Sequence, residues 1–291
     1  MDDPNRRTFL EGLPLLAAAL TAPAAPALAS AAIVQPQAGA GSGAGAAAQP
    51  ATPPGGEGRS WPEWLPSQDP AVVREMVGVS HRDLARVREL VERQPALANA
   101  TIDWGFGDWE SALGAASHVG QREIAELLIA HGARPSIFSA AMLGQLDVVR
   151  AFVAASPGIQ RTPGPHGLTL LSHARAGGDG AAAVVRYLES VGGADVRPAT
   201  AALDPADRDA VVGEYGFGVG AGDRFVIEVQ NDRLGIERPG RSRVLIFHTG
   251  ALVFFPAGVP SVRIAFAREG SRATRLTLAN PDVFLTATRV G

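Results

Sequence analysis

The chain contains no cysteine among its 291 residues. This absence excludes disulfide bonds, thiol nucleophiles and cysteine-ligated metal sites together. Basic charge is not in excess either, because the formal net charge at pH 7 is −3. No broad positive field is therefore available to attract nucleic acid or an anionic lipid surface. We expect neither of these as a partner.

Local metal-binding motifs are also absent. The His-x-x-x-His and His-Glu-x-x-His spacings do not occur, although a zinc ion needs three or four convergent ligands. We therefore predict that the chain binds no metal ion and no cofactor. Histidine often caps helix ends, so we expect capping or surface positions for His81, His118, His131, His166, His173 and His248.

Catalytic motifs are missing as well. The Gly-rich residues 216–223 lack the Lys-Ser/Thr ending of a phosphate-binding loop, and no helix is expected to follow them. They are predicted to form a turn between two strands. No nucleophile and base stand in a recognisable arrangement. The sequence therefore predicts a protein that is not an enzyme, and a hydrolase with an unfamiliar site is the alternative.

The amino-terminal residues have the order of an export signal. An Arg-Arg pair at 6–7 precedes Phe-Leu at 9–10 and a mild apolar run over 13–20, and Ala-x-Ala cleavage sites follow. This order resembles a twin-arginine signal, which implies a signal peptide over residues 1–31 and a periplasmic or other extracytoplasmic location. The apolar run is too short to span a bilayer stably, so no membrane span is expected after signal removal. Residues 32–60, rich in Ala, Gly and Pro, predict a disordered linker.

The next part of the chain repeats a helical pattern. Four segments, which begin at Ala85, Glu123, Asp147 and Ala183, have the spacing of short amphipathic helices and end in turns rich in Pro or Gly. Three of them follow a helix of small residues. Such short helices cannot bury their apolar faces alone, so we expect the pairs to stack on one another.

These units resemble ankyrin repeats. The matching positions lie in the helices, at their N-caps and in the glycine turns: Ser111, Leu113, Gly120, Leu128, Gly132, Gly144, Gly167, Thr169 and Leu171. Ser111 and Thr169 are predicted to cap helices. The resemblance implies an ankyrin-type α-solenoid of about four helix pairs over residues 61–200. A tetratricopeptide array is the alternative, but its marker tryptophan and tyrosine positions are missing.

The remaining residues, 208–291, change to the pattern of strands. Residues 223–238 alternate apolar and polar side chains around Asn231 and Asp232, which predicts a hairpin. About eight such strands predict a small antiparallel up-and-down β-barrel or sandwich. Their order resembles the lipocalin-like β domain that follows penicillin-recognising serine hydrolases. The Ser-x-x-Lys centre of those hydrolases is missing, so their activity is not implied.

The sequence thus predicts a multidomain α plus β protein, expected to be monomeric, whose function is binding. The first hypothesis is an exported, non-enzymatic protein–protein interaction scaffold that uses the surface of its ankyrin repeats. Aromatic side chains on a projecting loop are effective binding anchors. The candidate contacts on such a loop and on the neighbouring unit are Trp104, Phe106, Asp108, Trp109, Glu110, Arg134 and Phe138. Packing of Trp104 and Trp109 against the repeats is the alternative.

The alternative function is the binding of a small ligand or a cell-wall fragment by the β domain, with the repeats as an adaptor. This function requires an open barrel interior. An interior filled by side chains would argue against it. The residues expected to point inward are Phe225, Ile227, Leu245, Phe247 and Phe254.

Overall fold

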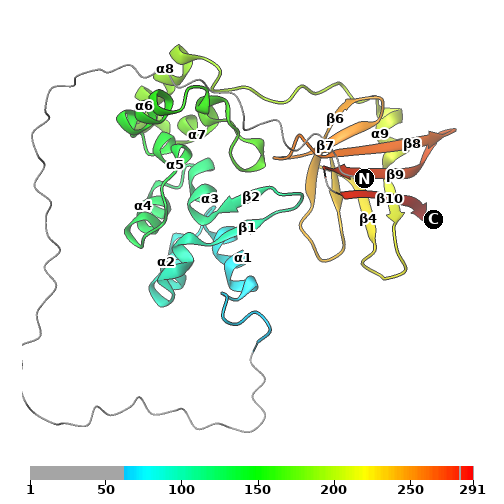
Figure 1. The fold of residues 1–291 in the computed structure, drawn as a ribbon, viewed down its shortest axis with the longest axis horizontal. Coiled ribbons are helices and arrows are strands. Elements are labelled where there is room, and N and C mark those ends of the chain that lie inside the picture. The colour runs from blue at the N-terminus through cyan, green and yellow to red at the C-terminus, as the bar shows by residue number, and fades with distance from the viewer. Residues whose placement is uncertain (1–61, 282, 291) are drawn as a thin grey trace, which may run out of the picture. The chain divides into compact units, whose positions relative to one another are not determined.

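The computed structural model describes residues 62–281 and 283–290. The predicted signal peptide, residues 1–31, and the predicted linker, residues 32–60, lie outside the described residues. All described residues belong to one unit of the chain. Within this unit, most of the helices come first along the sequence and the barrel strands follow (Figure 1).

Short helices make up the first part of the described chain. The α-helices are α1 (Pro70–Val79), α2 (Leu84–Arg93), α3 (Ala112–His118), α4 (Arg122–Ala130), α5 (Ile137–Met142), α6 (Leu146–Ala155), α7 (Leu170–Ala176) and α8 (Ala182–Val191). The 3-10 helices are η2 (Pro95–Asn99), η3 (Ile159–Arg161), η4 (Pro165–Gly167) and η5 (Gly178–Ala181). A two-stranded ribbon, β1 (Thr101–Asp103) and β2 (Trp109–Ser111), precedes α3. None of the described helices has the length and apolar character needed to cross a lipid bilayer.

Local sequence explains where several of these helices begin. Ser111 caps α3, as predicted, and its Oγ accepts a hydrogen bond from the backbone N–H of Gly114 at 2.9 Å. Thr169 caps α7, also as predicted, and its Oγ1 accepts from the backbone N–H of Ser172 at 3.2 Å. Each such cap stabilises a helix by about 1 kcal/mol. The starts of these two helices are therefore encoded locally.

The predicted ankyrin-type solenoid over residues 61–200 is wrong, because the structure shows no helical solenoid of this type. The first helices of successive pairs, α1, α3, α5 and α7, do not begin at a constant interval along the chain. The ribbon and the 3-10 helices interrupt the pairs, and the buried apolar residues form two separate clusters, one mainly from α1–α4 and one from α5–α8. A solenoid instead buries a continuous core between equivalent repeats. The N-caps, small residues and glycine turns that match the ankyrin pattern are common to short helical hairpins in general, so they do not specify a solenoid.

The carboxyl-terminal part forms a closed antiparallel β-barrel, so the predicted β domain is present. Helix α9 (Pro205–Val211), which the alternating pattern does not indicate, leads into it. The strands are β3 (Gly213–Gly216), β4 (Arg224–Gln230), β5 (Arg233–Glu237), β6 (Val244–Gly250), β7 (Val253–Pro256), β8 (Arg263–Glu269), β9 (Arg272–Asn280) and β10 (Val283–Val290). Each strand pairs with its neighbour along the chain, and β10 closes the barrel on β3.

Apolar side chains fill the barrel interior. One buried cluster draws residues from all eight strands. Ile227 and Phe254, which are expected inside, are 1 % and 0 % exposed. In β6 the buried residues are Val244 and Ile246 rather than the expected Leu245 and Phe247, because the inward-facing positions of this strand are offset by one residue. A filled interior argues against a ligand inside the barrel.

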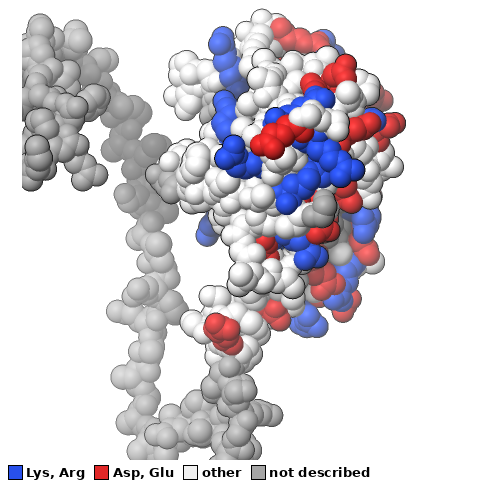
Figure 2. All heavy atoms as spheres, turned by 90° about the vertical axis from the view of Figure 1, so that its right-hand side faces the viewer, with Lys and Arg blue, Asp and Glu red and all other residues white. Residues whose placement is uncertain are grey.

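Two predicted turns are present in the barrel. Asn231 and Asp232, both at positive φ, connect β4 to β5 as a two-residue hairpin turn. The Gly-rich residues 216–223 connect β3 to β4. Figure 2 shows acidic and basic side chains interspersed over one face of the molecule. Every basic group apart from histidine and the amino terminus is an arginine, because the sequence contains no lysine.

Candidate metal centre

Three histidines and one glutamate that are far apart in the sequence lie together in the helical part. His81, Glu110, His118 and His166 each offer one nitrogen or oxygen atom, and these four atoms lie within 4.8 Å of one another. Glu110 is fully buried, and the three histidines are partly buried. Imidazole nitrogens and carboxylate oxygens are ligands of Zn²⁺ and related divalent ions. We call these four residues the His3Glu cluster.

The β1–β2 ribbon places Glu110. Successive side chains of a strand point to opposite faces, so Trp109 is 62 % exposed while Glu110 is buried. Glu110 pairs with Ile102 across the ribbon, and both side chains face the helices. The indole Nε1 of Trp104, in the turn of the ribbon, donates a hydrogen bond to Glu110 Oε2 at 2.7 Å. One oxygen of the carboxylate is thereby fixed.

Helix ends place two of the histidines. His81 follows the end of α1, and its Nδ1 lies 3.1 Å from the carbonyl oxygens of both Val77 and Gly78. Carbonyl oxygens only accept hydrogen bonds, so Nδ1 carries the proton and Nε2 of the neutral ring is free to ligate. His118 is the last residue of α3, and its Nε2 lies 3.1 Å from Nε2 of His81.

Asp108 holds the third histidine in an unusual backbone conformation. His166, in η4, has a φ of 58°, in the left-handed region that residues other than glycine seldom adopt. Its backbone N–H donates to Asp108 Oδ1 at 2.8 Å, and its side-chain Nδ1 donates to Oδ2 at 2.7 Å. This arrangement leaves Nε2 directed to the cluster. Histidine ligands of metal ions are commonly oriented by a carboxylate on the other ring nitrogen in this way.

Several nitrogen–oxygen distances in the His3Glu cluster are close to those between ligands of one tetrahedral ion. Two nitrogen or oxygen ligands of one tetrahedral zinc ion are about 3.3 Å apart, given their usual bond lengths of about 2.0–2.1 Å. Nε2 of His118 and Nε2 of His166 lie 2.8 Å and 3.4 Å from Glu110 Oε1. Nε2 of His81 lies 3.6 Å from Glu110 Oε2. The first of these distances is shorter than the tetrahedral value, and the other two are slightly longer.

The buried carboxylate of Glu110 keeps one oxygen without a hydrogen bond. No donor among the described residues forms a hydrogen bond of acceptable geometry with Oε1, although His118 Nε2 is only 2.8 Å away. The nitrogen therefore approaches the oxygen without directing a hydrogen at it. Leaving a buried charged oxygen unpaired is costly. A cation ligated by both atoms would remove this cost.

Opposing electrostatic effects determine the charges in the cluster. Burial raises the pKa of Glu110, but the neighbouring His118 and His166 outweigh burial and lower the pKa to about 2. Burial lowers the pKa of His166, but the neighbouring carboxylates of Asp108 and Glu110 outweigh burial and raise the pKa to about 9. Glu110 is therefore ionised at neutral pH, and the site attracts positive charge. A proton on His166 or a metal cation can supply that charge.

A fourth histidine lies beside the cluster without joining it. His173 is fully buried in α7, and the centroid of its ring is 6.3 Å from that of His118. Its Nδ1 lies 2.9 Å from the carbonyl oxygen of Thr169. Burial lowers the pKa of His173 to about 4. Its ring is therefore neutral near pH 7 and adds no positive charge next to the cluster.

Solvent reaches the His3Glu cluster through a groove. The groove has a volume of about 560 Å³ and runs along the end of α1. His81 and His166 both line it, and Trp104 forms part of its wall. An ion can therefore enter from this side, while Glu110 is at the buried end of the site.

Two residues of the predicted partner surface are exposed. Trp109 is 62 % exposed on β2, and Arg134 is exposed after the end of α4. They lie on different elements, and neither belongs to the His3Glu cluster. Their contact with a partner protein stays a prediction.

The side chains of the other residues of that predicted surface are buried or half-buried. Asp108 and Glu110 are 4 % and 0 % exposed, and Trp104 packs against the core of α1–α4. Phe106 packs against the barrel core, and Phe138 against the core of α5–α8. Their burial favours roles within the protein over direct contact with a partner.

Sequence reasoning missed the His3Glu cluster, because its four ligands come from four separate segments and share no short spacing. A weaker signal was available. His81 and His118 each stand at the end of a helical segment, and Asp108 and Glu110 alternate around Trp109. Polar groups on the inward face of a short strand need partners, and histidines at nearby helix ends were the candidates.

Comparisons of the chain with models of protein families, with curated proteins and with solved structures found no match. The resemblances to ankyrin repeats and to the lipocalin-like β domain therefore gain no support from known proteins. The function has to be inferred from the geometry of the site.

Proposed function

We propose that this protein binds one divalent transition-metal ion, Zn²⁺, at the His3Glu cluster and that the ion stabilises its helical part. The observation that carries the proposal is the convergence of four ligand atoms around a buried carboxylate oxygen that has no hydrogen bond. Four protein ligands are typical of structural rather than catalytic zinc sites. The proposal is compatible with the predicted absence of catalysis, which stays a prediction.

The hydrogen bonds around the cluster support ligation by Nε2. Nδ1 of His81 donates to backbone carbonyl oxygens, and Nδ1 of His166 donates to Asp108. Both rings thus place their protons away from the cluster. Outer hydrogen bonds of this kind fix the tautomer of a ligand and raise its basicity.

The charges also support a divalent ion. Glu110 and Asp108 are both buried, and together they bring two negative charges to one small region. Histidines that ligate a metal ion through Nε2 are neutral and add no charge. A divalent cation would therefore make the region electrically neutral, which reduces the cost of burying its carboxylates.

The bound ion would join four separate segments. These are the end of α1, the β1–β2 ribbon, the end of α3 and the η4 turn, which carry His81, Glu110, His118 and His166. Ligand binding that is confined to the folded state stabilises it by about 2.7 kcal/mol at a free-ligand concentration of 100 times Kd. We therefore expect the ion to raise the melting temperature.

Isothermal titration of chelator-treated protein with Zn²⁺ tests this proposal. We expect one equivalent to bind and the melting temperature to rise with the zinc concentration. Co²⁺ in place of Zn²⁺ should give the strong visible absorption of a tetrahedral site. His118→Ala and Glu110→Gln should weaken binding by at least tenfold, because each removes one ligand.

His131→Ala is the matched control, since His131 follows α4 and offers no atom to the cluster. It should bind Zn²⁺ like the unmodified protein. Circular dichroism would establish that each variant is folded. If the unmodified protein binds no zinc, or if zinc leaves its melting temperature unchanged, the proposal is wrong, whatever the variants do.

A further inference from the structure

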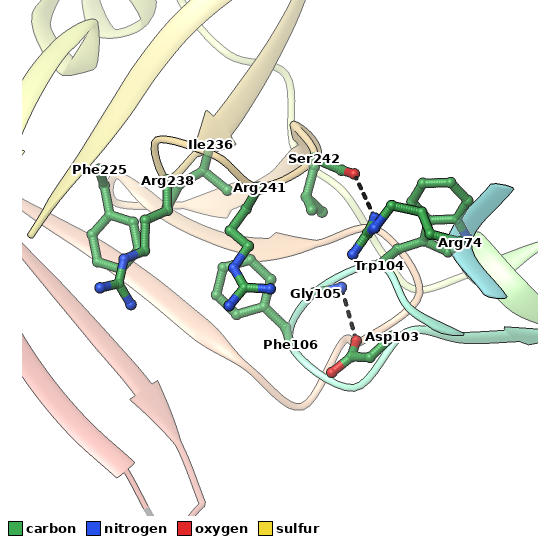
Figure 3. A pocket seen from close by; sticks show the side chains of 11 residues that line it. Arg74, Asp103, Trp104, Gly105, Phe106, Phe225, Ile236, Arg238, Arg241 and Ser242 are labelled. Carbon is green, nitrogen blue, oxygen red and sulfur yellow. Dashed lines mark hydrogen bonds between the residues drawn. The ribbon is translucent and has the colours of Figure 1, made fainter. Parts of the chain in front are cut away.

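A second cavity, of about 390 Å³, lies between the helical part and the barrel. Residues from α1, from the turn of the β1–β2 ribbon, from β4 to β6 and from the loop between β5 and β6 line it (Figure 3). Phe106 at the tip of the ribbon packs against the barrel core, and Arg74 Nη1 lies 3.3 Å from Ser242 Oγ. The cavity contains no residue of the His3Glu cluster, so none of its lining residues would ligate the proposed metal ion. We call it the arginine pocket.

Three guanidinium groups line the arginine pocket, and two of them have no acidic partner. Arg238 forms an ion pair with Asp223, at 3.2 Å between Nη2 and Oδ1. Arg74 and Arg241 form no ion pair with any residue in the described part of the chain. Figure 3 shows Arg241 between the other two arginines. Unpaired guanidinium groups near one cavity favour an anion there.

One carboxylate also lines the pocket, but hydrogen bonds with the backbone already engage it. Asp103 Oδ1 accepts from the N–H groups of Gly105 at 2.8 Å and of Gly107 at 3.1 Å. These bonds hold the turn of the ribbon closed. The dashed line between Gly105 and Asp103 in Figure 3 marks the first of them. Asp103 therefore has a structural role, and the three arginines leave the lining with an excess of positive charge.

Apart from Ser242 and Gly105, the rest of the lining consists of apolar and aromatic side chains. Trp104 and Phe106 contribute from the ribbon, and Phe225, Ile236 and Val244 contribute from the barrel. The guanidinium carbon of Arg74 lies 5.8 Å from the centre of a Trp104 ring. A site that combines apolar walls with a few charged groups fits a ligand with an apolar body and one charged group.

We infer that the arginine pocket binds a small molecule that carries an oxyanion, a carboxylate or a phosphate, on a single aromatic ring. Arg241 and Arg74 bind the oxyanion, and the ring packs against Phe106 and Phe225. The volume is at the lower end of the range for small-molecule sites, which is about 300–1,000 Å³, so it limits the ligand to about one ring. The β domain would then contribute to ligand binding, as one alternative from the sequence holds, but at its outer surface and not in the barrel interior, which side chains fill.

Titration calorimetry with phenyl phosphate and with benzoate tests the inference. Benzyl alcohol tests the need for the charge, and inorganic phosphate tests the need for the ring. We expect at least one of the two aromatic anions to bind, and both benzyl alcohol and inorganic phosphate to bind at least tenfold more weakly. We expect an aromatic anion to bind both with and without a metal chelator, because no lining residue of the pocket belongs to the His3Glu cluster, which separates this test from the zinc proposal.

Variants locate the binding. Arg241→Gln and Arg74→Gln should each raise the Kd of the aromatic anion at least fivefold. Arg272→Gln is the matched control, because Arg272 is exposed on β9 and does not line the pocket; its Kd should not change. Absence of binding by both aromatic anions, equal binding of benzyl alcohol or of inorganic phosphate, or an unchanged Kd in both pocket variants would each overturn the inference.

Discussion

Trp104 illustrates how much one side chain can contribute at the residue scale. Its indole N–H donates to Glu110 Oε2 at 2.7 Å, and its ring lines both the groove beside the His3Glu cluster and the arginine pocket. The sequence predicts Trp104 either as a contact for a partner protein or as a side chain packed against the helical units. In the structure it orients a buried carboxylate and packs against the helical core, and residues that orient a metal ligand affect metal affinity without touching the ion.

Trp104→Phe should therefore weaken zinc binding about tenfold, the lower limit for the loss of an outer-shell partner. The substitution keeps an aromatic ring but removes the only hydrogen-bond donor of the indole. Competition with a chromophoric chelator would measure the affinity. Trp109→Phe is the matched control, because Trp109 is 62 % exposed on the opposite face of the ribbon. Equal zinc affinity in the two variants would contradict the role of Trp104.

At the residue scale, the roles that could be predicted from the sequence are those determined by neighbouring residues along the chain. The N-caps Ser111 and Thr169 follow from the hydroxyl side chain and the helical pattern after it. The role of Glu110 as a ligand does not follow from the local sequence, because it depends on histidines that only the tertiary fold brings close to Glu110. An acidic residue in a polar loop is normally exposed, and nothing in the local pattern marks this one as buried.

At the element scale, the turn between α3 and α4 shows why a glycine is needed at one position. Gly120 has a φ of 78°, and a Cβ atom there would overlap the carbonyl oxygen of Ala176 at the end of α7. Gly132, after α4, has a similar φ of 88°, but a Cβ atom there would meet no atom within 4 Å. The two glycines thus share the backbone conformation and differ in their surroundings.

Gly120→Ala should consequently destabilise the protein more than Gly132→Ala. The left-handed backbone costs each alanine about 1–2 kcal/mol, and the overlap with α7 should add about 1–3 kcal/mol to the first variant only. Urea denaturation of both variants would measure the difference in the free energy of unfolding. Equal values for the two variants would mean that α7 does not approach this turn as closely as the structure shows.

Elements with strong local signals were predictable, and their assembly was not. The Asn231-Asp232 turn and the alternating strands indicate the barrel. Short helices with small residues and glycine turns indicate helical hairpins, but the same features suit several ways of packing them. The ribbon β1–β2 was expected only as a loop, although it carries Glu110 and separates the first helical pair from the second.

At the scale of the whole molecule, the ribbon and the η4 turn connect the helical part with the barrel. Phe106, at the tip of the ribbon, packs against the barrel core. Asp108, which binds His166 of η4, lies close to Gly258 in the loop between β7 and β8. Two residues of the His3Glu cluster, Glu110 and His166, are thus carried by the segments that contact the barrel. No pattern within the helical or the strand part of the sequence indicates this arrangement.

Removal of zinc should accordingly loosen these segments first. Without the ion, the ribbon and η4 lose shared ligands, and segments with fewer stabilising contacts open more often and exchange their amide hydrogens faster. We expect a chelator to increase exchange in residues 101–111 and 164–168, while β8 and β9, which pair along most of their length, stay protected. Hydrogen exchange read by mass spectrometry would show both regions in one experiment. His118→Ala should show the same pattern without a chelator, because it lacks one ligand of the ion. A uniform increase over the whole chain would show instead that the ion controls global unfolding, and no increase anywhere would show that these segments are held without it.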